Sequence, residues 1–119
     1  MKVLLIYPPA TVFGPGEIFP HPPLGIAYLA AYVRRLGHNV KIIDTLAEGK
    51  GKIKKKGKFR RFGLSEKEIK KRILKFKPDV VGISVMFTAF ADDALAVAKL
   101  AKKTITQVTV VMGGAHVSI

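Results

Sequence analysis

The sequence contains no cysteine. Without thiols the chain can form neither a disulfide framework nor a zinc site or iron–sulfur cluster held by cysteine ligands. Long apolar runs are lacking as well. The first hydrophobic stretch, residues 3–7, is too short to span a membrane, and no small-residue cleavage site follows it. We therefore expect a cytoplasmic protein whose fold depends on a hydrophobic core.

Acidic residues are few, with 8 Asp and Glu against 21 Lys and Arg and a net charge of +13. A charge of this size attracts polyanions, including nucleic acid. Much of the excess lies between Lys50 and Arg61 and in the helical pattern that follows. Two interpretations of segment 50–61 stay open: a solvated basic loop, or a contact with nucleic acid.

One stretch, residues 79–88 with the sequence DVVGISVMFT, has the composition of a central strand. Its nearly continuous β-branched run is typical of a parallel strand covered by helices on both faces. In open parallel sheets, ligands bind beyond the carboxyl ends of the strands. Ser84, Met86 and Thr88 are therefore the first candidates for ligand contact.

Strand and helix patterns alternate along the whole chain. Strands are expected at residues 2–7, 40–43, 79–88 and 108–112, and helices at residues 23–36, 64–75 and 89–103. This order predicts an α/β fold: a doubly wound, flavodoxin-like parallel sheet of four strands with helices on both faces. A complete flavodoxin-like domain needs a fifth strand. We therefore expect residues 1–119 to be one incomplete domain from the amino-terminal part of a longer protein.

Local signals refine three of these elements. The helix at 23–36 is expected to bury a stripe made by Leu24, Ala27, Tyr28, Ala31 and Tyr32. Ser65 and Glu68 form a capping box for the helix at 64–75. Proline and glycine predict an irregular loop at 10–23, and glycines among lysines predict a mostly irregular, flexible basic insertion at 47–63.

Two strand ends carry residues suited to a ligand: Ser84 to Thr88 after the third strand, and Gly113 to His116 after the fourth. A glycine pair lets a ligand lie directly on the backbone. A GxS strand end, followed by a hydrophobic strand that ends in GGA, resembles the cobalamin-binding domain. Ser84, Val85 and Met86 stand where that family has its serine-x-leucine element, Thr88 stands at its next threonine, and Gly113 and Gly114 match its glycine pair.

The amino-terminal part of the sequence resembles one particular branch of this family. The run VLLIYPP, a loop, and then PPLGIAYLAAYVRRLGHNVKIID resemble the start of cobalamin-dependent radical-SAM enzymes. The resemblance implies that this chain binds cobalamin, while a barrel outside it holds a [4Fe–4S] cluster and S-adenosylmethionine. It also implies that the chain by itself has no catalytic residues and no resident metal site.

The resemblance further implies how cobalamin is held. The two strand ends enclose its nucleotide tail, with hydroxyls of Ser84 and Thr88 and backbone N–H groups near Gly113 as partners, and with Ala115 and His116 beside them. An apolar floor for the corrin ring is expected from Pro8, Pro9, Val12 and Phe13, with Met86 or Phe87. The Asp-x-His-x-x-Gly motif, by which another branch supplies a histidine to cobalt, is absent. Cobalamin is therefore expected to bind without that ligand.

Other interpretations stay open at this point. Ser84 is also compatible with a core strand, and the glycine pair with a tight turn. A flavin or nucleotide is a possible ligand for the same fold, although the chain has neither GxGxxG after its first strand nor GxxxxGK[ST]. His38 and the acids Asp92 and Asp93 are expected to be structural, and an uncovered edge strand predicts self-association.

Overall fold

The computed structural model describes residues 1–13, 24–49, 53–85 and 91–114. Four strands form a parallel sheet in the order β3-β1-β6-β7. They are β1 (Lys2–Tyr7), β3 (Asn39–Asp44), β6 (Val80–Ser84) and β7 (Thr109–Gly113). The four predicted parallel strands are therefore confirmed.

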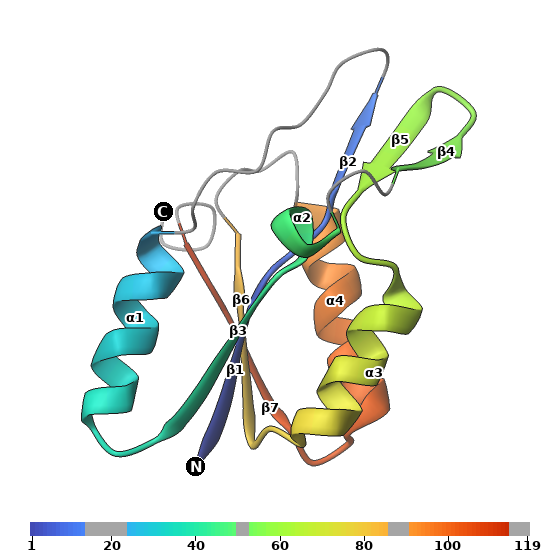
Figure 1. The fold of residues 1–119 in the computed structure, drawn as a ribbon. Coiled ribbons are helices and arrows are strands. Elements are labelled where there is room, and N and C mark those ends of the chain that lie inside the picture. The colour runs from blue at the N-terminus through green and yellow to red at the C-terminus, as the bar shows by residue number, and fades with distance from the viewer. Residues whose placement is uncertain (14–23, 50–52, 86–90, 115–119) are drawn as a thin grey trace.

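Helices lie on both faces of this sheet (Figure 1). Helix α1 (Leu24–Arg35) packs on the face that carries Val3, Leu5 and Val40. Helices α3 (Glu66–Phe76) and α4 (Ala91–Thr104) cover the opposite face. None of the described helices combines the length and the apolar composition that a membrane crossing requires.

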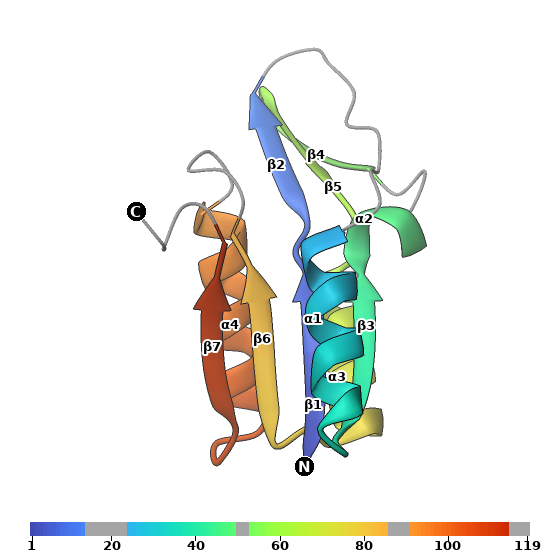
Figure 2. The ribbon, with the colours of Figure 1, turned by 90° about the vertical axis from the view of Figure 1, so that its left-hand side faces the viewer.

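Strand β6 is not buried on both faces, contrary to the prediction. Val81 and Ile83 are 0% and 2% exposed and point toward α3 and α4, whereas Gly82 and Ser84 on the other face are only half-buried. Figure 2 gives the reason, since α1 lies in front of β1 and β3 and leaves β6 and β7 uncovered on its side. The doubly buried strand is β1, in which residues 3–6 are all buried.

Helix α1 confirms its predicted bounds but not its predicted stripe. Ile26 and Ala30 are buried, and Val33 packs against them, while Tyr28 and Tyr32 are 76% and 62% exposed. The helix is apolar around most of its circumference, so the sequence contained two possible helical stripes. The position of α1 over β1 and β3 selects the one through Ile26.

Helix α3 begins as its sequence predicts. The hydroxyl of Ser65 accepts a hydrogen bond from the backbone N–H of Glu68 at 3.2 Å. Leu64, Ile69 and Ile73 are almost completely buried in the core between α3, α4 and the sheet. The helix ends at Lys77, which has a left-handed backbone with φ of 54°.

A second, antiparallel sheet extends from the carboxyl edge of the parallel one (Figure 1). Its order is β2-β5-β4, with β2 at Ala10–Phe13, β4 at Ile53–Lys56 and β5 at Phe59–Phe62. The irregular structure predicted for 47–63 is therefore wrong, as is the loop prediction for residues 10–13. Pairing with β2, distant in sequence, orders the β4–β5 hairpin, and Gly57 with φ of 62° forms its turn.

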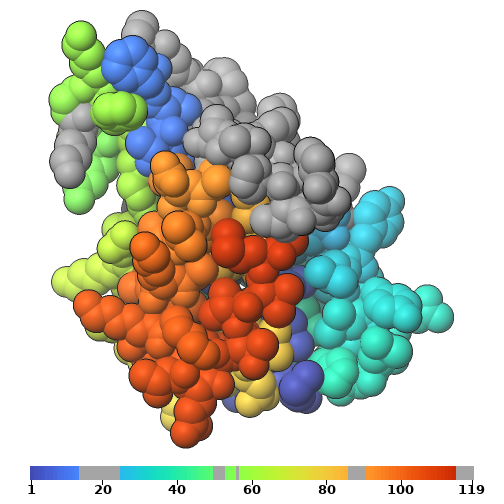
Figure 3. All heavy atoms as spheres, turned by 180° about the vertical axis from the view of Figure 1, so that it is seen from behind, coloured from blue at the N-terminus to red at the C-terminus, as the bar shows by residue number. Residues whose placement is uncertain are grey.

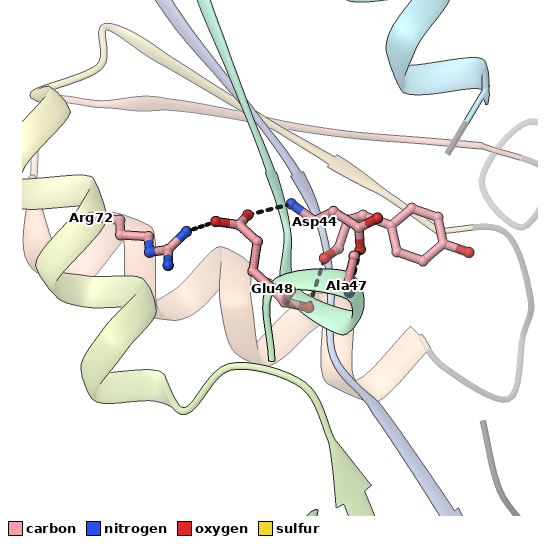
Figure 4. A network of polar contacts seen from close by, with 6 residues as sticks. Asp44, Ala47, Glu48 and Arg72 are labelled. Atoms are coloured by element: carbon pink, nitrogen blue, oxygen red, sulfur yellow. Dashed lines mark hydrogen bonds and ion pairs between the residues drawn. The ribbon is translucent and has the colours of Figure 1, made fainter. Parts of the chain in front are cut away.

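The short helix α2 (Thr45–Glu48) joins the two sheets and was not predicted. Asp44 caps it, accepting a hydrogen bond from the N–H of Ala47, and Glu48 pairs with Arg72 of α3 (Figure 4). Thr45 is completely buried and donates its hydroxyl to the carbonyl oxygen of Tyr7 at 2.8 Å. These contacts fix the end of β3 beside the end of β1.

Candidate functional site

The carboxyl ends of β6 and β7 lie side by side. Ser84 is the register partner of Gly113, and the N–H of Val85 donates to the carbonyl oxygen of Gly113 at 2.7 Å. The two strand ends that the sequence singled out are thus brought together at one edge of the sheet.

A cavity of about 270 Å³ lies beside these strand ends. It is bounded by one flank of α1 and by the face of β6 and β7 that no described helix covers. In Figure 3, atoms of β6 and β1 are visible between α1 and β7 on this side of the molecule. The lining is Leu5, Gly25, Ile26, Leu29, Gly82, Ile83, Ser84, Val111, Gly113 and Gly114. The cavity is therefore apolar, with a serine hydroxyl at its strand-end side.

The two glycines of the pair differ in what surrounds them. A Cβ on Gly113 would meet no atom of the described residues within 4 Å, so a side chain there would extend into the cavity. Gly114 has φ of 122°, and a Cβ there would lie 2.6 Å from the carbonyl oxygen of Val85. Gly114 is thus required by the backbone, whereas Gly113 keeps the cavity open.

The predicted proline floor does not reach this cavity. Pro8 and Pro9 are both buried where β1 continues into β2, and Pro9 packs against Gly63. Val12 is half-buried in the antiparallel sheet, and Phe13 is 68% exposed at its outer end. Contact of these four residues with a ligand stays a prediction that the cavity itself does not support.

Five further candidates, Met86, Phe87, Thr88, Ala115 and His116, lie outside the described residues. His21 does as well. Their roles stay predictions.

Most of the apolar lining was not predicted from the sequence. Gly82 could have been predicted, because alternation along a strand places it on the same face as Ser84. Nothing in the sequence marks Leu5, Leu29 and Val111 as cavity residues, since apolar residues in a strand or helix are expected in any core. Their exposure to a cavity depends on α1 covering only half of the sheet.

No titratable side chain is among the described residues that line the cavity. Tyr7, at the end of β1, has its pKa raised above the ordinary value by burial and by the negative charge of Asp44. The Nδ1 atom of His38 lies 3.2 Å from the terminal amino group, at the amino edge of the sheet. Among the described residues no group of three or more His, Cys, Asp or Glu side chains is arranged to hold a metal ion.

Comparison with known proteins gives relatives along the whole chain. The cytidylyl-2-hydroxyethylphosphonate methyltransferase of Streptomyces wedmorensis is 40% identical over 97% of this chain and 22% of its own length. An uncharacterized methyltransferase of Pyrococcus horikoshii is 44% identical over 99% of this chain and 22% of its own length. The anaerobic magnesium-protoporphyrin IX monomethyl ester cyclase of Rubrivivax gelatinosus is 28% identical over 98% of this chain and 18% of its own length.

The chain thus spans about a fifth of the length of the curated relatives it matches. Residues 19–119 match the family described as the B12 binding domain. This range covers most of the chain and contains both strand ends and every residue of the cavity lining except Leu5. The chain therefore belongs to the B12 binding domain family and is a cobalamin-binding domain.

Proposed function

We propose that the chain holds the nucleotide tail of cobalamin in the cavity between α1 and the carboxyl ends of β6 and β7. The observation that carries this proposal is the open position of Gly113, beside Ser84, on a face of the sheet that α1 leaves uncovered. The family membership identifies the ligand as cobalamin, and the cavity is the place proposed for its tail.

Size and chemistry both favour the tail. A volume of about 270 Å³ is below the roughly 300 to 1,000 Å³ of pockets that enclose a whole drug-sized ligand. An aromatic base fits such a space better than a corrin ring does. Leu5, Leu29 and Val111 provide apolar walls, and the hydroxyl of Ser84 provides a partner for a polar atom of the tail.

The corrin ring would then lie outside the cavity, at the carboxyl edge of the sheet. Bound cobalamin supplies a cobalt that can carry a methyl group, while residues of this chain orient the tail and keep water from it. We propose that no histidine of an Asp-x-His-x-x-Gly motif ligates the cobalt, because the sequence lacks that motif.

We also propose that the chain is the cobalamin-binding part of a radical-SAM enzyme that catalyses methyl transfer or related chemistry. Two of the relatives are named as methyltransferases and one as a cyclase, and each is several times longer than this chain. The [4Fe–4S] cluster and S-adenosylmethionine belong, in this proposal, to a barrel outside the chain. The order of the described parallel strands, second-first-third-fourth, agrees with the first four strands of a flavodoxin-like domain.

The proposal is tested by absorbance titration of the chain with hydroxocobalamin and with cobinamide, a corrinoid that lacks the nucleotide tail. The native chain is expected to bind hydroxocobalamin saturably and more tightly than cobinamide. Gly113→Leu should fill the cavity, weaken hydroxocobalamin binding at least tenfold and remove the preference, because cobinamide places nothing in the cavity.

Thr109→Leu is the matched control. It adds the same side chain to the same face of β7, four residues away and outside the cavity lining, so binding should not change. Native-like affinity of the Gly113→Leu variant for hydroxocobalamin would contradict the tail site. Tight binding of a flavin or nucleotide by a folded chain that does not bind corrinoids would favour a flavin or nucleotide as the ligand of this fold.

Two further partners are proposals. Strand β7 pairs only with β6 among the described strands, so a second copy of the chain is proposed to pair along its other edge. A contact with nucleic acid rests on different residues, in the antiparallel sheet.

A further inference from the structure

The antiparallel sheet has one basic and aromatic face. Thr11 lies opposite Arg61, Phe13 opposite Phe59, and Lys54 opposite Arg61 on its other side. Because side chains alternate between the faces of a strand, these five residues share one face. Ala10 and Phe62 lie on the other face, where they are buried with Leu46. We call the face formed by Thr11, Phe13, Lys54, Phe59 and Arg61 the arm face.

Two aromatic rings on the arm face are open to solvent. Phe13 and Phe59 are 68% and 51% exposed, with ring centroids 5.3 Å apart and ring planes at 65°. Burial against the core therefore does not account for either ring. Exposed large apolar side chains that lie together mark interaction surfaces.

Cations share the arm face with these rings, since Lys54 and Arg61 lie on it. In sequence, segment 50–61 contains eight Lys and Arg and no Asp or Glu. A hollow of about 580 Å³ on the arm face is lined by Thr11, Lys54, Gly57, Phe59 and Arg61. One acid of the described residues, Asp93, contacts this face, and its two carboxylate oxygens accept hydrogen bonds from the N–H and hydroxyl of Thr11 at 2.8 and 2.7 Å. The acid is thus tied to the inner end of the face.

We propose that the arm face binds single-stranded nucleic acid. Unpaired bases would stack on Phe59 and Phe13, and the phosphates between them would pair with Lys54 and Arg61. This combination of a cationic groove with exposed aromatic rings is how proteins bind single strands without strong sequence preference. The bases of a duplex are stacked inside it, and the Asp and Glu side chains of an acidic protein carry no rings, so both partners would contact the cations and not the aromatic pair. The arm face shares no residue with the cavity lining, so the arm face is separate from the proposed site of the nucleotide tail.

The test is fluorescence anisotropy of a labelled oligouridine of about 10 nucleotides with the full chain, over a range of salt concentrations. Phe59→Ala should weaken its binding about tenfold through lost stacking, with binding of inorganic polyphosphate unchanged. Phe59→Tyr keeps a ring and should bind like the native chain. Replacing Lys54 and Arg61 with alanine should reduce the slope of log K against log salt by about 1.4, since each phosphate contact on a single strand contributes about 0.7.

The control replaces Lys99 and Lys103, two exposed lysines of α4, with alanine. This variant loses the same amount of positive charge, but at positions outside the arm face. The slope of log K against log salt should therefore stay near that of the native chain. Equal affinity for oligouridine and polyphosphate, with no effect of Phe59→Ala, would overturn the proposal in favour of a general cationic surface. Tighter binding of poly-L-glutamate or of a duplex would overturn it in favour of those partners, and so would an absence of oligouridine binding at low salt.

Discussion

At the scale of single residues, Gly113 and Gly114 show that adjacent glycines can be present for different reasons. Gly114 has a positive φ and no room for a Cβ, while Gly113 has open space. We therefore expect Gly114→Ala to lower the free energy of unfolding by about 2 kcal/mol or more through backbone strain. Gly113→Ala should leave it unchanged or raise it slightly. Urea unfolding of both variants measures the difference, and equal losses would contradict these separate roles.

Residues of the site were predictable where a general rule places them. Ser84 and Gly113 follow from the rule that carboxyl ends of parallel strands meet at one edge of a sheet. Leu29 and Val111 do not, because nothing in an apolar side chain distinguishes a core contact from a cavity wall. Pro9 was expected in an apolar floor for the corrin ring, yet it is buried where β1 continues into β2, with Gly63 packed against it.

At the scale of elements, Asp93 attaches β2 to the beginning of α4. Its carboxylate accepts two hydrogen bonds from Thr11, whereas its neighbour Asp92 is exposed. Since hydrogen bonds to a charged group contribute about 1.5 to 3 kcal/mol, Asp93→Ala should destabilise the chain by about 2 kcal/mol more than Asp92→Ala. The matched variant removes an acid from the same helix end, so the loss of helix-dipole stabilisation is similar in both.

Hydrogen exchange distinguishes a local effect from a global one. In Asp93→Ala, the amides of β2 and β5 should lose protection more than those of β1 and β6. Uniform loss over the whole chain would show that the Thr11 contact does not anchor the antiparallel sheet in particular.

Elements were predictable where their signals are local. Helix α3 carries its cap, its buried stripe and its terminating proline within its own sequence. The hairpin β4–β5 was missed because its lysines and glycines resemble a loop, and its order comes from β2, about fifty residues away. Such long-range pairing leaves little trace in a local pattern.

At the scale of the whole molecule, the net charge of +13 opposes the self-association that the edge of β7 favours. Salt screens this repulsion, with a Debye length of about 10 Å at 0.1 M. We expect the mass measured by light scattering after size exclusion to rise from monomer toward dimer as salt increases. Thr109→Lys adds a charge to β7 and should suppress the rise. A monomer at every salt and protein concentration would contradict pairing through β7.

The alternation of strands and helices was enough to predict the parallel sheet, because each strand is rich in apolar residues and each crossover contains a helix. It did not predict that α1 covers only half of one face. That asymmetry comes from packing, and it produces both the cavity and the correction to β6.

The carbonyl oxygen of Thr45 accepts hydrogen bonds from the N–H groups of Gly49 and Leu64, both at 3.0 Å. The segment between Gly49 and Leu64, which contains the β4–β5 hairpin, therefore starts and ends at the same carbonyl oxygen. A segment whose ends already coincide can change length at small cost, since doubling a loop costs only about 0.6 kcal/mol in closure entropy. We expect insertions and deletions relative to homologous chains to collect between Gly49 and Leu64. Gly49 and Leu64 are also suitable positions for exchanging the hairpin: an unrelated hairpin inserted between them can replace the basic one without changing the course of the four parallel strands.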